Sequence, residues 1–444
     1  MANHVAPNTD LPRIAESEAL WRRARALIPA GTQTLAKGPT QYVDGVAPKY
    51  LARGRGARVW DVDGNEYIDL SMAVGPVVLG YSHPAVDLAI RRQLEDGITF
   101  SLMHPLEVEV AERIAAVIPC AESVRFAKTG AEATSAAVRL ARAWTGRSRI
   151  VCCGYHGWHD WYIAVTDRHA GIPEAVQDLT HTFNYNDIES LESALDSDVA
   201  AVILEPVVFE LPQPRFLEDL RDAVHRAGAL LIFDEMWTGF RLALGGAQAH
   251  FGVIPDLATF SKAVANGMPL AVLTGRADVM ALLERDVFFF STFGGEALSL
   301  AAAIATLREL EAHEVPGHLA ALGRRLRDGF NAIAAELELS EIAACHGPLC
   351  RTLVAFRGDA VDPLLARSLV QQELLRWGVL WSGTHTLSAA HRDEDIEYIL
   401  RAWRSALSEL RAAIDDGGIR SRLRGKPVEP VFRRTGNFNV KPRQ

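Results

Sequence analysis

The sequence predicts an α/β fold, in which a large domain with a mostly parallel sheet is accompanied by a smaller α+β domain. From Ser71 onward, helical segments alternate with short apolar runs such as Val199–Leu204 and Ala229–Phe233, which are typical of strands buried on both faces. Strand, helix and strand in this order favour parallel pairing with right-handed crossovers. At 444 residues the chain is also too long for one small core.

The parts of the chain outside this alternation predict the smaller domain. Ile14–Leu27 has the periodicity of an amphipathic helix, and Ala57–Leu70 alternates apolar and polar residues about an Asp-Gly turn, which predicts a hairpin. We therefore expect residues 1–70 to belong to the smaller domain, 71–315 to form the large domain and 316–444 to complete the smaller one. The end of the chain, from Gly417 to Gln444, carries eight basic residues and one acid, which suits either a solvated tail or a strap over a partner subunit.

Composition and charge exclude several classes of protein. The chain is 49% hydrophobic and 23% charged, as ordinary globular proteins are, and its net charge of −9 argues against a nucleic-acid partner. No apolar run approaches the roughly 18 residues of a membrane span, and Met1–Asp10 has no apolar core of signal-peptide type. The five cysteines are odd in number and lack zinc-ligand spacing, so we expect reduced thiols and no metal site. Together these observations predict a cytoplasmic enzyme with no membrane partner.

Lys262 is the first candidate for chemistry. Only six of the 46 basic residues are lysines, and this one follows an apolar run and precedes the turn Asn266–Pro269. An amine at a strand end can form a Schiff base, which a guanidinium cannot, although a lysine that merely extends to solvent fits the same pattern.

Asp234 is the second candidate. It ends the apolar run Ala229–Phe233, at the sheet edge where open α/β folds bind ligands. Alone, it would more often be a helix cap or a partner in a structural ion pair. With Lys262 on the next strand it forms the pair that pyridoxal 5′-phosphate requires, since a carboxylate holds the pyridine nitrogen protonated while an amine holds the aldehyde of the same ring.

Three further segments follow predicted strands. Thr129, Gly130 and Ala131 join a strand to a helix N-terminus, which suits a phosphate but also an ordinary capped helix. Gly154–Tyr162 is an aromatic loop, which predicts either a lined cavity or a loop filled by its own rings. Its two histidines lack a third ligand with convincing spacing, so we reject a metal site there. Glu205 is an acid at the end of another apolar strand.

In this order, these pieces resemble the class III, fold-type-I aminotransferases that depend on pyridoxal phosphate. They are most similar to the branch that contains glutamate-1-semialdehyde aminomutase, and the likeness covers most of the chain. The stretches that carry it are Asp61–Asp69, Gly75-Pro76, Thr129–Ala133, Tyr155–Gly157, Glu205–Val207, Phe233–Arg241, and Ser261-Lys262 with Asn266–Pro269. Each stretch alone is weakly diagnostic, whereas their joint order is highly specific.

The resemblance implies a role for each candidate residue. Lys262 would form the internal aldimine and move the proton between substrate and cofactor, and Asp234 would pair with the pyridine nitrogen. The other implied cofactor contacts are Tyr155 and His156 beside the ring, Met236 on the opposite face, Thr129, Gly130 and Ala131 at the phosphate, and Glu205 behind them. Thr292 would reach the phosphate of a neighbouring subunit, so the resemblance also implies a homodimer.

Several departures from this branch bear on the substrate. Lys37 stands where the aminomutase has an arginine that receives the substrate carboxylate, and Gly294-Gly295-Glu296 replaces a Gly-Asn-Pro stretch. Trp381–His385 lacks the glutamate of the corresponding stretch, and Trp237 replaces a glutamine. The candidate substrate contacts are therefore Lys37, Trp158, Trp237, Trp381 and His385. These departures look more like members from sugar, surface-polysaccharide and aminoglycoside pathways.

The sequence leaves three functions open. The first is an aminotransferase that moves an amino group from glutamate or glutamine to an aldehyde or ketone, such as a sugar or another polyhydroxylated carbonyl. The second is an aminomutase or epimerase of the glutamate-1-semialdehyde 2,1-aminomutase type. The third is a non-enzymatic protein that binds pyridoxal phosphate, which the intact Lys262, Asp234 and phosphate loop disfavour.

Overall fold

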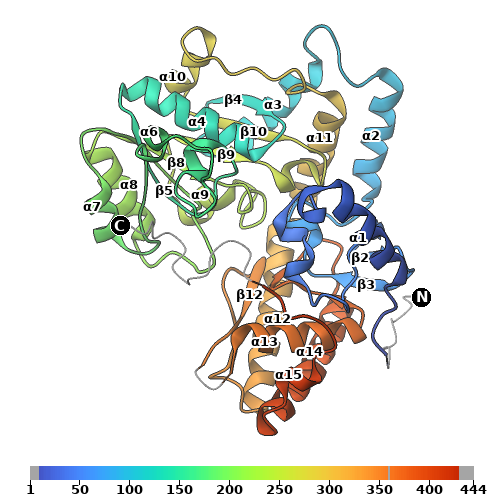
Figure 1. The fold of residues 1–444 in the computed structure, drawn as a ribbon. Coiled ribbons are helices and arrows are strands. Elements are labelled where there is room, and N and C mark those ends of the chain that lie inside the picture. Colours follow the sequence, from blue (N-terminus) through green and yellow to red (C-terminus); the bar gives the residue numbers. More distant parts are fainter. Residues whose placement is uncertain (1–9, 359–360, 430–444) are drawn as a thin grey trace. The chain divides into compact units, whose positions relative to one another are not determined.

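The computed structural model describes residues 10–358 and 361–429, which divide by their internal contacts into two compact units (Figure 1). The larger unit comprises residues 84–316. The smaller unit comprises residues 10–83 together with the described residues that follow 316. Residues 1–9, 359–360 and 430–444, which include part of the predicted basic tail, lie outside the described residues.

A seven-stranded sheet forms the centre of the larger unit. Its strands, in spatial order, are β4 (Ser123–Ala127), β10 (Ala271–Gly275), β9 (Leu257–Phe260), β8 (Leu230–Asp234), β7 (Val199–Leu204), β5 (Arg149–Cys153) and β6 (Thr180–Thr182). The strands from β9 to β6 are parallel, which confirms the predicted sheet, whereas β10 is antiparallel to both of its neighbours. β10 reverses because the connection after β9 is too short for a crossover helix.

Helices cover this sheet. They are α2 (Pro84–Asp96), α3 (Pro105–Val117), α4 (Gly130–Thr145), α5 (Asp160–Ile163), α6 (Glu174–Gln177), α7 (Ile188–Ala194), α8 (Phe216–Arg226), α9 (Gly246–Phe251), α10 (Ala277–Met280) and α11 (Ala297–Ala312). α8 buries apolar residues at the spacing of one helical face, from Phe216 to Val224, and each large side chain so buried contributes on the order of 1.5–3 kcal/mol. Every residue of β7 and β8 is buried, as the continuous apolar runs predict.

The smaller unit has two sheets. One contains β1 (Leu51–Arg55), β2 (Arg58–Asp61), β3 (Glu66–Asp69) and β13 (Val379–Leu380), and the other contains β11 (Ala343–His346), β12 (Arg351–Phe356) and β14 (Thr384–Thr386). The main helices are α1 (Ala15–Leu27), α12 (Val315–Glu336), α13 (Pro363–Arg376), α14 (Asp393–Asp415) and α15 (Ile419–Arg422). β13 pairs in parallel with β3, so one sheet joins the N-terminal hairpin to the C-terminal part of the chain. This is the smaller α+β domain that the sequence predicts.

One boundary differs from the expected one. Residues 71–83 lie in the smaller unit, where Tyr81 forms an antiparallel bridge with Gly56 beside the hairpin. Glu296, the last residue of the Gly294-Gly295-Glu296 stretch, caps α11 by accepting backbone N–H groups of its first turn.

All five cysteines are free and buried. Burial raises the pKa of the Cys120 thiol to about 12 and that of Cys345 to about 11, so both stay protonated at neutral pH. Within residues 10–358 and 361–429, no helix is long and apolar enough to cross a membrane, and no group of three or more His, Cys, Asp and Glu side chains is placed to hold a metal ion.

Candidate active site

Asp234 and Lys262 follow neighbouring strands at one edge of the larger sheet. Asp234 is the last residue of β8, and it pairs with Thr259 of the parallel strand β9. Lys262 comes three residues after Thr259 and begins the short 3-10 helix η5 (Lys262–Ala265). Strand spacing and chain length limit the distance between the Cα atoms of Asp234 and Lys262 to at most about 16 Å. The two predicted strand ends are thus adjacent in space.

The backbone of Lys262 has an uncommon conformation. Its φ of +46° lies in the left-handed region, which costs a non-glycine residue about 1–3 kcal/mol. Ser261 fixes the strand end by donating its hydroxyl to the carbonyl oxygen of Leu270 at 2.7 Å. Asn266 and Gly267 also have positive φ and turn the chain back into β10. Strain of this kind persists where the surrounding structure holds a side chain in a required place.

The carboxylate of Asp234 is buried and held by two donors. Oδ2 accepts a hydrogen bond from Nδ1 of His156 at 2.8 Å, and Oδ1 accepts one from the backbone N–H of Met236 at 3.0 Å. His156 belongs to the aromatic loop after β5, two strands away from β8. Its other ring nitrogen, Nε2, is buried and has no hydrogen-bond partner in the described part of the chain. His156 therefore orients the Asp234 carboxylate.

Glu205, which follows β7, lies in the same cluster of charges. Burial raises the pKa of Glu205 and the nearby Asp234 raises it further, whereas the backbone N–H of Tyr155, the ring of His156 and the amine of Lys262 lower it. The Tyr155 N–H donates to Oε1 of Glu205 at 2.6 Å. Glu205 follows β7, Asp234 ends β8 and Lys262 follows β9, so the three charged groups come from three neighbouring strands at one edge of the sheet.

The aromatic loop has a rigid backbone. Gly154 and Gly157 have φ values of +111° and +103°, and neither has room for a side chain. A Cβ at Gly154 would lie 2.8 Å from Oε1 of Glu205, and a Cβ at Gly157 would lie 2.7 Å from Cβ of Ala131. The ring of Tyr155 stays 45% exposed beside this packed backbone. The ring is therefore accessible to a ligand.

The first turn of α4 is the candidate phosphate site. The Thr129 hydroxyl accepts the N–H of Glu132 at 3.3 Å, and the Glu132 carboxylate accepts the N–H of Thr129 at 2.8 Å. This capping box uses the N–H of Thr129. The N–H groups of Gly130 and Ala131 lie in the first turn of the helix, where the helix itself supplies no acceptor, so they can bind an anion. A Cβ at Gly130 would lie 2.6 Å from Sδ of Met236, so Met236 packs directly on this turn.

Thr292 is exposed and lies in a loop that contacts β4 and the short segment between β4 and α4. Before it, Arg125 of β4 donates to the carbonyl oxygen of Phe289 at 3.2 Å. After it, Glu296 forms an ion pair with Lys128 at 2.9 Å. The Thr292 side chain itself makes no hydrogen bond within the described residues.

Four of the candidate substrate residues are aromatic or imidazole rings, and only one of them is exposed. Trp158 is 69% exposed on the aromatic loop. Trp237 is 3% exposed, and its indole N–H donates to a backbone carbonyl at 3.2 Å. Trp381 and His385 are fully buried in the smaller unit, where each packs edge-on with the ring of Trp403. Trp237, Trp381 and His385 thus have little exposed surface in this structure, and their role as substrate contacts stays a prediction.

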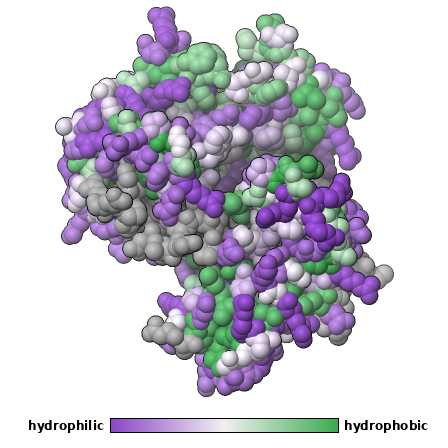
Figure 2. Space-filling view, in the orientation of Figure 1, coloured by the Kyte–Doolittle hydropathy of each residue, from purple (hydrophilic) through white to green (hydrophobic). Residues whose placement is uncertain are grey.

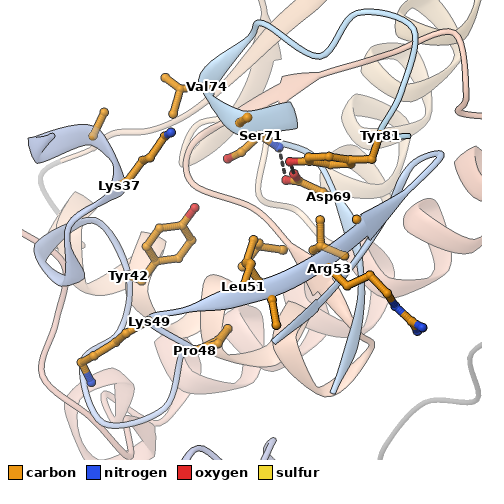
Figure 3. Close-up of a pocket in the computed structure, with 16 residues that line it drawn as sticks. Lys37, Tyr42, Pro48, Lys49, Leu51, Arg53, Asp69, Ser71, Val74 and Tyr81 are labelled. Atoms are coloured by element: carbon orange, nitrogen blue, oxygen red, sulfur yellow. Dashed lines mark hydrogen bonds between the residues drawn. The ribbon is translucent and has the colours of Figure 1, made fainter. Parts of the chain in front are cut away.

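Lys37 lines a cavity of about 440 Å³ in the smaller unit (Figure 3). Figure 3 shows the side chains of Lys37, Tyr42 and Ser71 turned toward one end of this cavity. The remaining wall is mainly apolar, with Pro48, Leu51, Val59, Val74 and Leu380 among its residues. The sequence singled out Lys37 for its position in a motif, but it held no signal for Tyr42, whose hydroxyl interacts with Ser71 and Ser382 farther along the chain.

The turn beside Lys37 is strained and is held by a buried acid. Met72, Ala73 and Val74 have φ values of +43°, +57° and +70°, which is rare for consecutive residues with side chains. Asp69 accepts hydrogen bonds from the Ser71 N–H at 2.7 Å, from the Tyr81 hydroxyl at 2.7 Å, and from the backbone of the turn. Burial raises the pKa of Asp69. A signal for this turn was present in the sequence, because a strand ended in an acid shortly before Gly75-Pro76.

Comparisons with known proteins agree in the kind of enzyme they identify. The family model described as "Aminotransferase class-III" matches residues 43–360. The chain is 35% identical to 3-aminobutyryl-CoA aminotransferase of Cloacimonas acidaminovorans, over 90% of this chain and 98% of that protein. It is 38% identical to glutamate-1-semialdehyde 2,1-aminomutase of Thermus thermophilus, over 88% of this chain and 99% of that protein. The structure of the FumI protein of Sphingopyxis sp. MTA144, in its PLP internal aldimine form, matches with a TM-score of 0.84 at 31% identity, covering 93% of this chain and 98% of that one.

Proposed function

Because the chain belongs to the class III aminotransferases, which use pyridoxal phosphate, we propose that it moves an amino group from an amino acid, glutamate or glutamine, to an aldehyde or ketone. The observation that carries this proposal is the adjacency of Asp234 and Lys262 at one sheet edge, with His156 orienting the carboxylate. An acid and an amine on neighbouring strands can serve opposite ends of one pyridine ring.

The residues at this edge fit pyridoxal phosphate. Asp234 suits the protonated pyridine nitrogen, Lys262 suits the aldehyde, and the free N–H groups of Gly130 and Ala131 suit the phosphate. Tyr155 and Met236 would contact the two faces of the ring. When bound, the cofactor draws electron density from the substrate carbon that loses a proton.

Three side chains of the protein have separate roles in the proposed reaction. His156 keeps Asp234 in one orientation, so the carboxylate charge stays where a pyridine nitrogen needs it. The amine of Lys262 would accept the proton from the substrate Cα and, as the ammonium, would deliver it to the cofactor carbon that carries the aldehyde. Glu205 holds the backbone of Tyr155 and so fixes the ring that faces the ligand.

We propose a sugar or another polyhydroxylated carbonyl as the amino acceptor. The support is the exposed indole of Trp158, which lies on the rigid aromatic loop close to Tyr155. Aromatic rings on a rigid backbone supply broad contact area at low entropic cost, which suits the C–H face of a ring-shaped substrate. A panel of keto-sugars and simple aldehydes should show higher kcat/KM for the keto-sugars, and a preference for small apolar aldehydes would reject this acceptor class.

The donor half of the reaction provides the test of the aminotransferase. Glutamate or glutamine added alone, without an acceptor, should release about one equivalent of keto acid per active site and remove the visible absorption band of the cofactor. A carbonyl acceptor added afterwards should restore the band. The measurement needs stopped-flow absorbance and quantification of the keto acid.

An aminomutase is the second candidate, and the 38% identity to the enzyme from Thermus thermophilus favours it. An aminomutase shifts the amino group within one molecule and therefore releases no keto acid from glutamate. If glutamate and glutamine leave the band unchanged while glutamate-1-semialdehyde is converted to its isomer, the aminotransferase proposal is rejected.

We propose that the active form is a homodimer in which Thr292 contacts the phosphate of the neighbouring subunit. The support is a set of exposed apolar side chains on the larger unit, in the α2–α3 connection and around Thr292. They are Leu102 (79% exposed), Met103 (82%), Phe288 (74%), Phe290 (63%) and Phe293 (56%). Figure 2 shows hydrophobic surface over the α2–α3 connection. Apolar groups of this size and number are typical of surfaces that associate.

The double substitution Leu102→Glu and Met103→Glu should convert the dimer to a monomer, because it places charge at an apolar interface. The matched control is Leu27→Glu, which changes an equally exposed leucine of the smaller unit (84%) and should leave the mass unchanged. Light scattering measures the mass, and equilibrium dialysis measures cofactor retention, which should fall in the monomer and in Thr292→Val. A monomeric wild-type protein with full activity would contradict the proposal.

A further inference from the structure

The aromatic loop after β5 is fastened to α4 by two neighbouring residues of the helix. Thr134 is fully buried and donates its hydroxyl to the carbonyl oxygen of His156 at 2.8 Å. Ser135 accepts the indole N–H of Trp161 at 2.9 Å, and its hydroxyl lies 2.7 Å from Nδ1 of His159. Because an indole N–H can only donate, the hydroxyl hydrogen of Ser135 remains for the imidazole. One serine of the helix therefore holds two rings of the loop.

The imidazole that Ser135 holds is in contact with Trp158. The rings of His159 and Trp158 meet edge-on, with their centres 5.0 Å apart and their planes at 86°. The backbone of His159 is fixed as well, because its carbonyl oxygen accepts the N–H groups of Tyr162 and Ile163 at the start of α5. Edge-to-face ring pairs favour particular orientations. His159 therefore restricts the orientation of an indole that is otherwise 69% exposed.

The same helix carries the candidate phosphate turn. Ser135 follows Ala131 by four residues, which is about 6 Å along the helix axis. The residues between and after them are largely buried, so α4 is packed as a rigid element between the two positions. Contacts through His159 and Ser135 thus relate the position of the Trp158 indole to the place where a phosphate would bind.

We propose that Ser135 and His159 are positioning residues that set the orientation of Trp158 and thereby the specificity for the amino acceptor. The inference rests on the proposed function, in which Trp158 contacts the acceptor. His159 acts through the indole, and Ser135 acts through the imidazole. Their loss should therefore weaken the acceptor half of the reaction and leave the donor half unchanged, whereas a role in the stability of the loop alone would affect both halves.

Fluorine-19 NMR of the cofactor-loaded protein labelled with 5-fluorotryptophan tests the positions of the rings without an activity assay. The signal that disappears in Trp158→Phe identifies this residue. In Ser135→Ala and in His159→Phe that signal should sharpen and move toward the shift of free 5-fluorotryptophan, because the indole gains rotational freedom. Ser135→Thr keeps the hydroxyl and should keep the wild-type signal. The matched control is Ser193→Ala on α7, whose hydroxyl donates only to the carbonyl oxygen of Glu189, and it should change nothing.

Kinetics of the two half-reactions test the effect on specificity. Ser135→Ala and His159→Phe should lower kcat/KM for a keto-sugar at least about fivefold, mainly through a higher KM, and should change the rate with glutamate by less than about twofold. Small aldehydes, which are too short to cover the indole, should be converted as well as by the wild type. In a Trp158→Ala background His159→Phe should have no further effect, because the ring through which it acts is gone.

The two variants differ in their structural consequences. Ser135→Ala leaves the indole N–H of Trp161 without its acceptor, whereas His159→Phe keeps that hydrogen bond, so the histidine variant tests the inference even if the serine variant fails to fold. The inference would be overturned by an unchanged Trp158 signal in His159→Phe, by equal losses in both half-reactions, or by an undiminished effect of His159→Phe in the Trp158→Ala background. Failure of the proposed function would instead appear in the wild type, as no keto acid from glutamate or no preference for keto-sugars.

Discussion

Lys262→Ala is expected to remove the visible absorption band of the bound cofactor and to lower kcat by at least about 10⁴-fold. The substitution deletes the amine that follows β9, the strand next to Asp234. Lys128 is the other lysine of residues 84–316, and its amine forms an ion pair with Glu296 at 2.9 Å. Lys128 is therefore not expected to replace Lys262 in holding the aldehyde or in moving the substrate proton.

Two variants separate the amine chemistry of Lys262 from its charge. Lys262→Arg keeps a cation at the strand end but cannot form a carbon–nitrogen double bond with an aldehyde, so it should lose the band as completely as the alanine variant. Lys128→Met is the matched control and should keep the band. Absorbance spectra and single-turnover rates with glutamate provide the measurement. A Lys262→Ala protein that keeps the band and turns over at a normal rate would refute the assignment.

The elements that carry the chemistry were predictable because their patterns are local. β7 and β8 are continuous apolar runs of five or six residues that end in Glu205 and Asp234, and such runs specify buried parallel strands whose ends meet at one edge. Lys262 was identified by the turn that follows it, which also explains why β10 reverses direction. The capping box at Thr129 is likewise formed by residues that are close together in the sequence.

The surroundings of the substrate were not predictable because they depend on partners far away in the chain. The sequence resemblance made Trp381 and His385 candidate substrate contacts, yet both rings pack on Trp403 of α14. No local sequence pattern predicts this contact. Conversely, no local pattern singled out Arg367, and only the fold shows that its guanidinium is largely buried and pairs with no carboxylate of the described residues. Sequence periodicity tells which face of an element is apolar, but it does not tell which side chain of another element will meet that face.

Asp234→Asn is the substitution with the second-largest expected effect: kcat should fall by about 10²- to 10⁴-fold while the cofactor stays bound. Asparagine keeps the size of the side chain and can still accept the N–H of Met236. His156 can move its proton to Nε2, which has no partner in the described structure, and can then accept a hydrogen bond from the new amide. The fold is thus preserved, but no negative charge remains to hold the pyridine nitrogen protonated, so the ring withdraws electrons less strongly.

Glu205→Gln provides the control, because it makes the corresponding carboxyl-to-amide change at the end of the neighbouring strand. Burial and Asp234 already raise the pKa of Glu205, which favours its neutral form, so this substitution should change kcat by less than about tenfold. The pKa of Glu205 in the folded protein lies above its value of about 4.3 in the unfolded chain. The wild type should therefore lose stability as the pH rises from about 4.3 through the raised pKa, and the glutamine variant should lack this loss. Melting temperatures across pH and rates of the donor half-reaction measure both effects. The assignment of Asp234 as the acid that pairs with the pyridine nitrogen would be rejected by either of two results. One is an Asp234→Asn variant with full activity, and the other is a Glu205→Gln variant that loses more activity than Asp234→Asn.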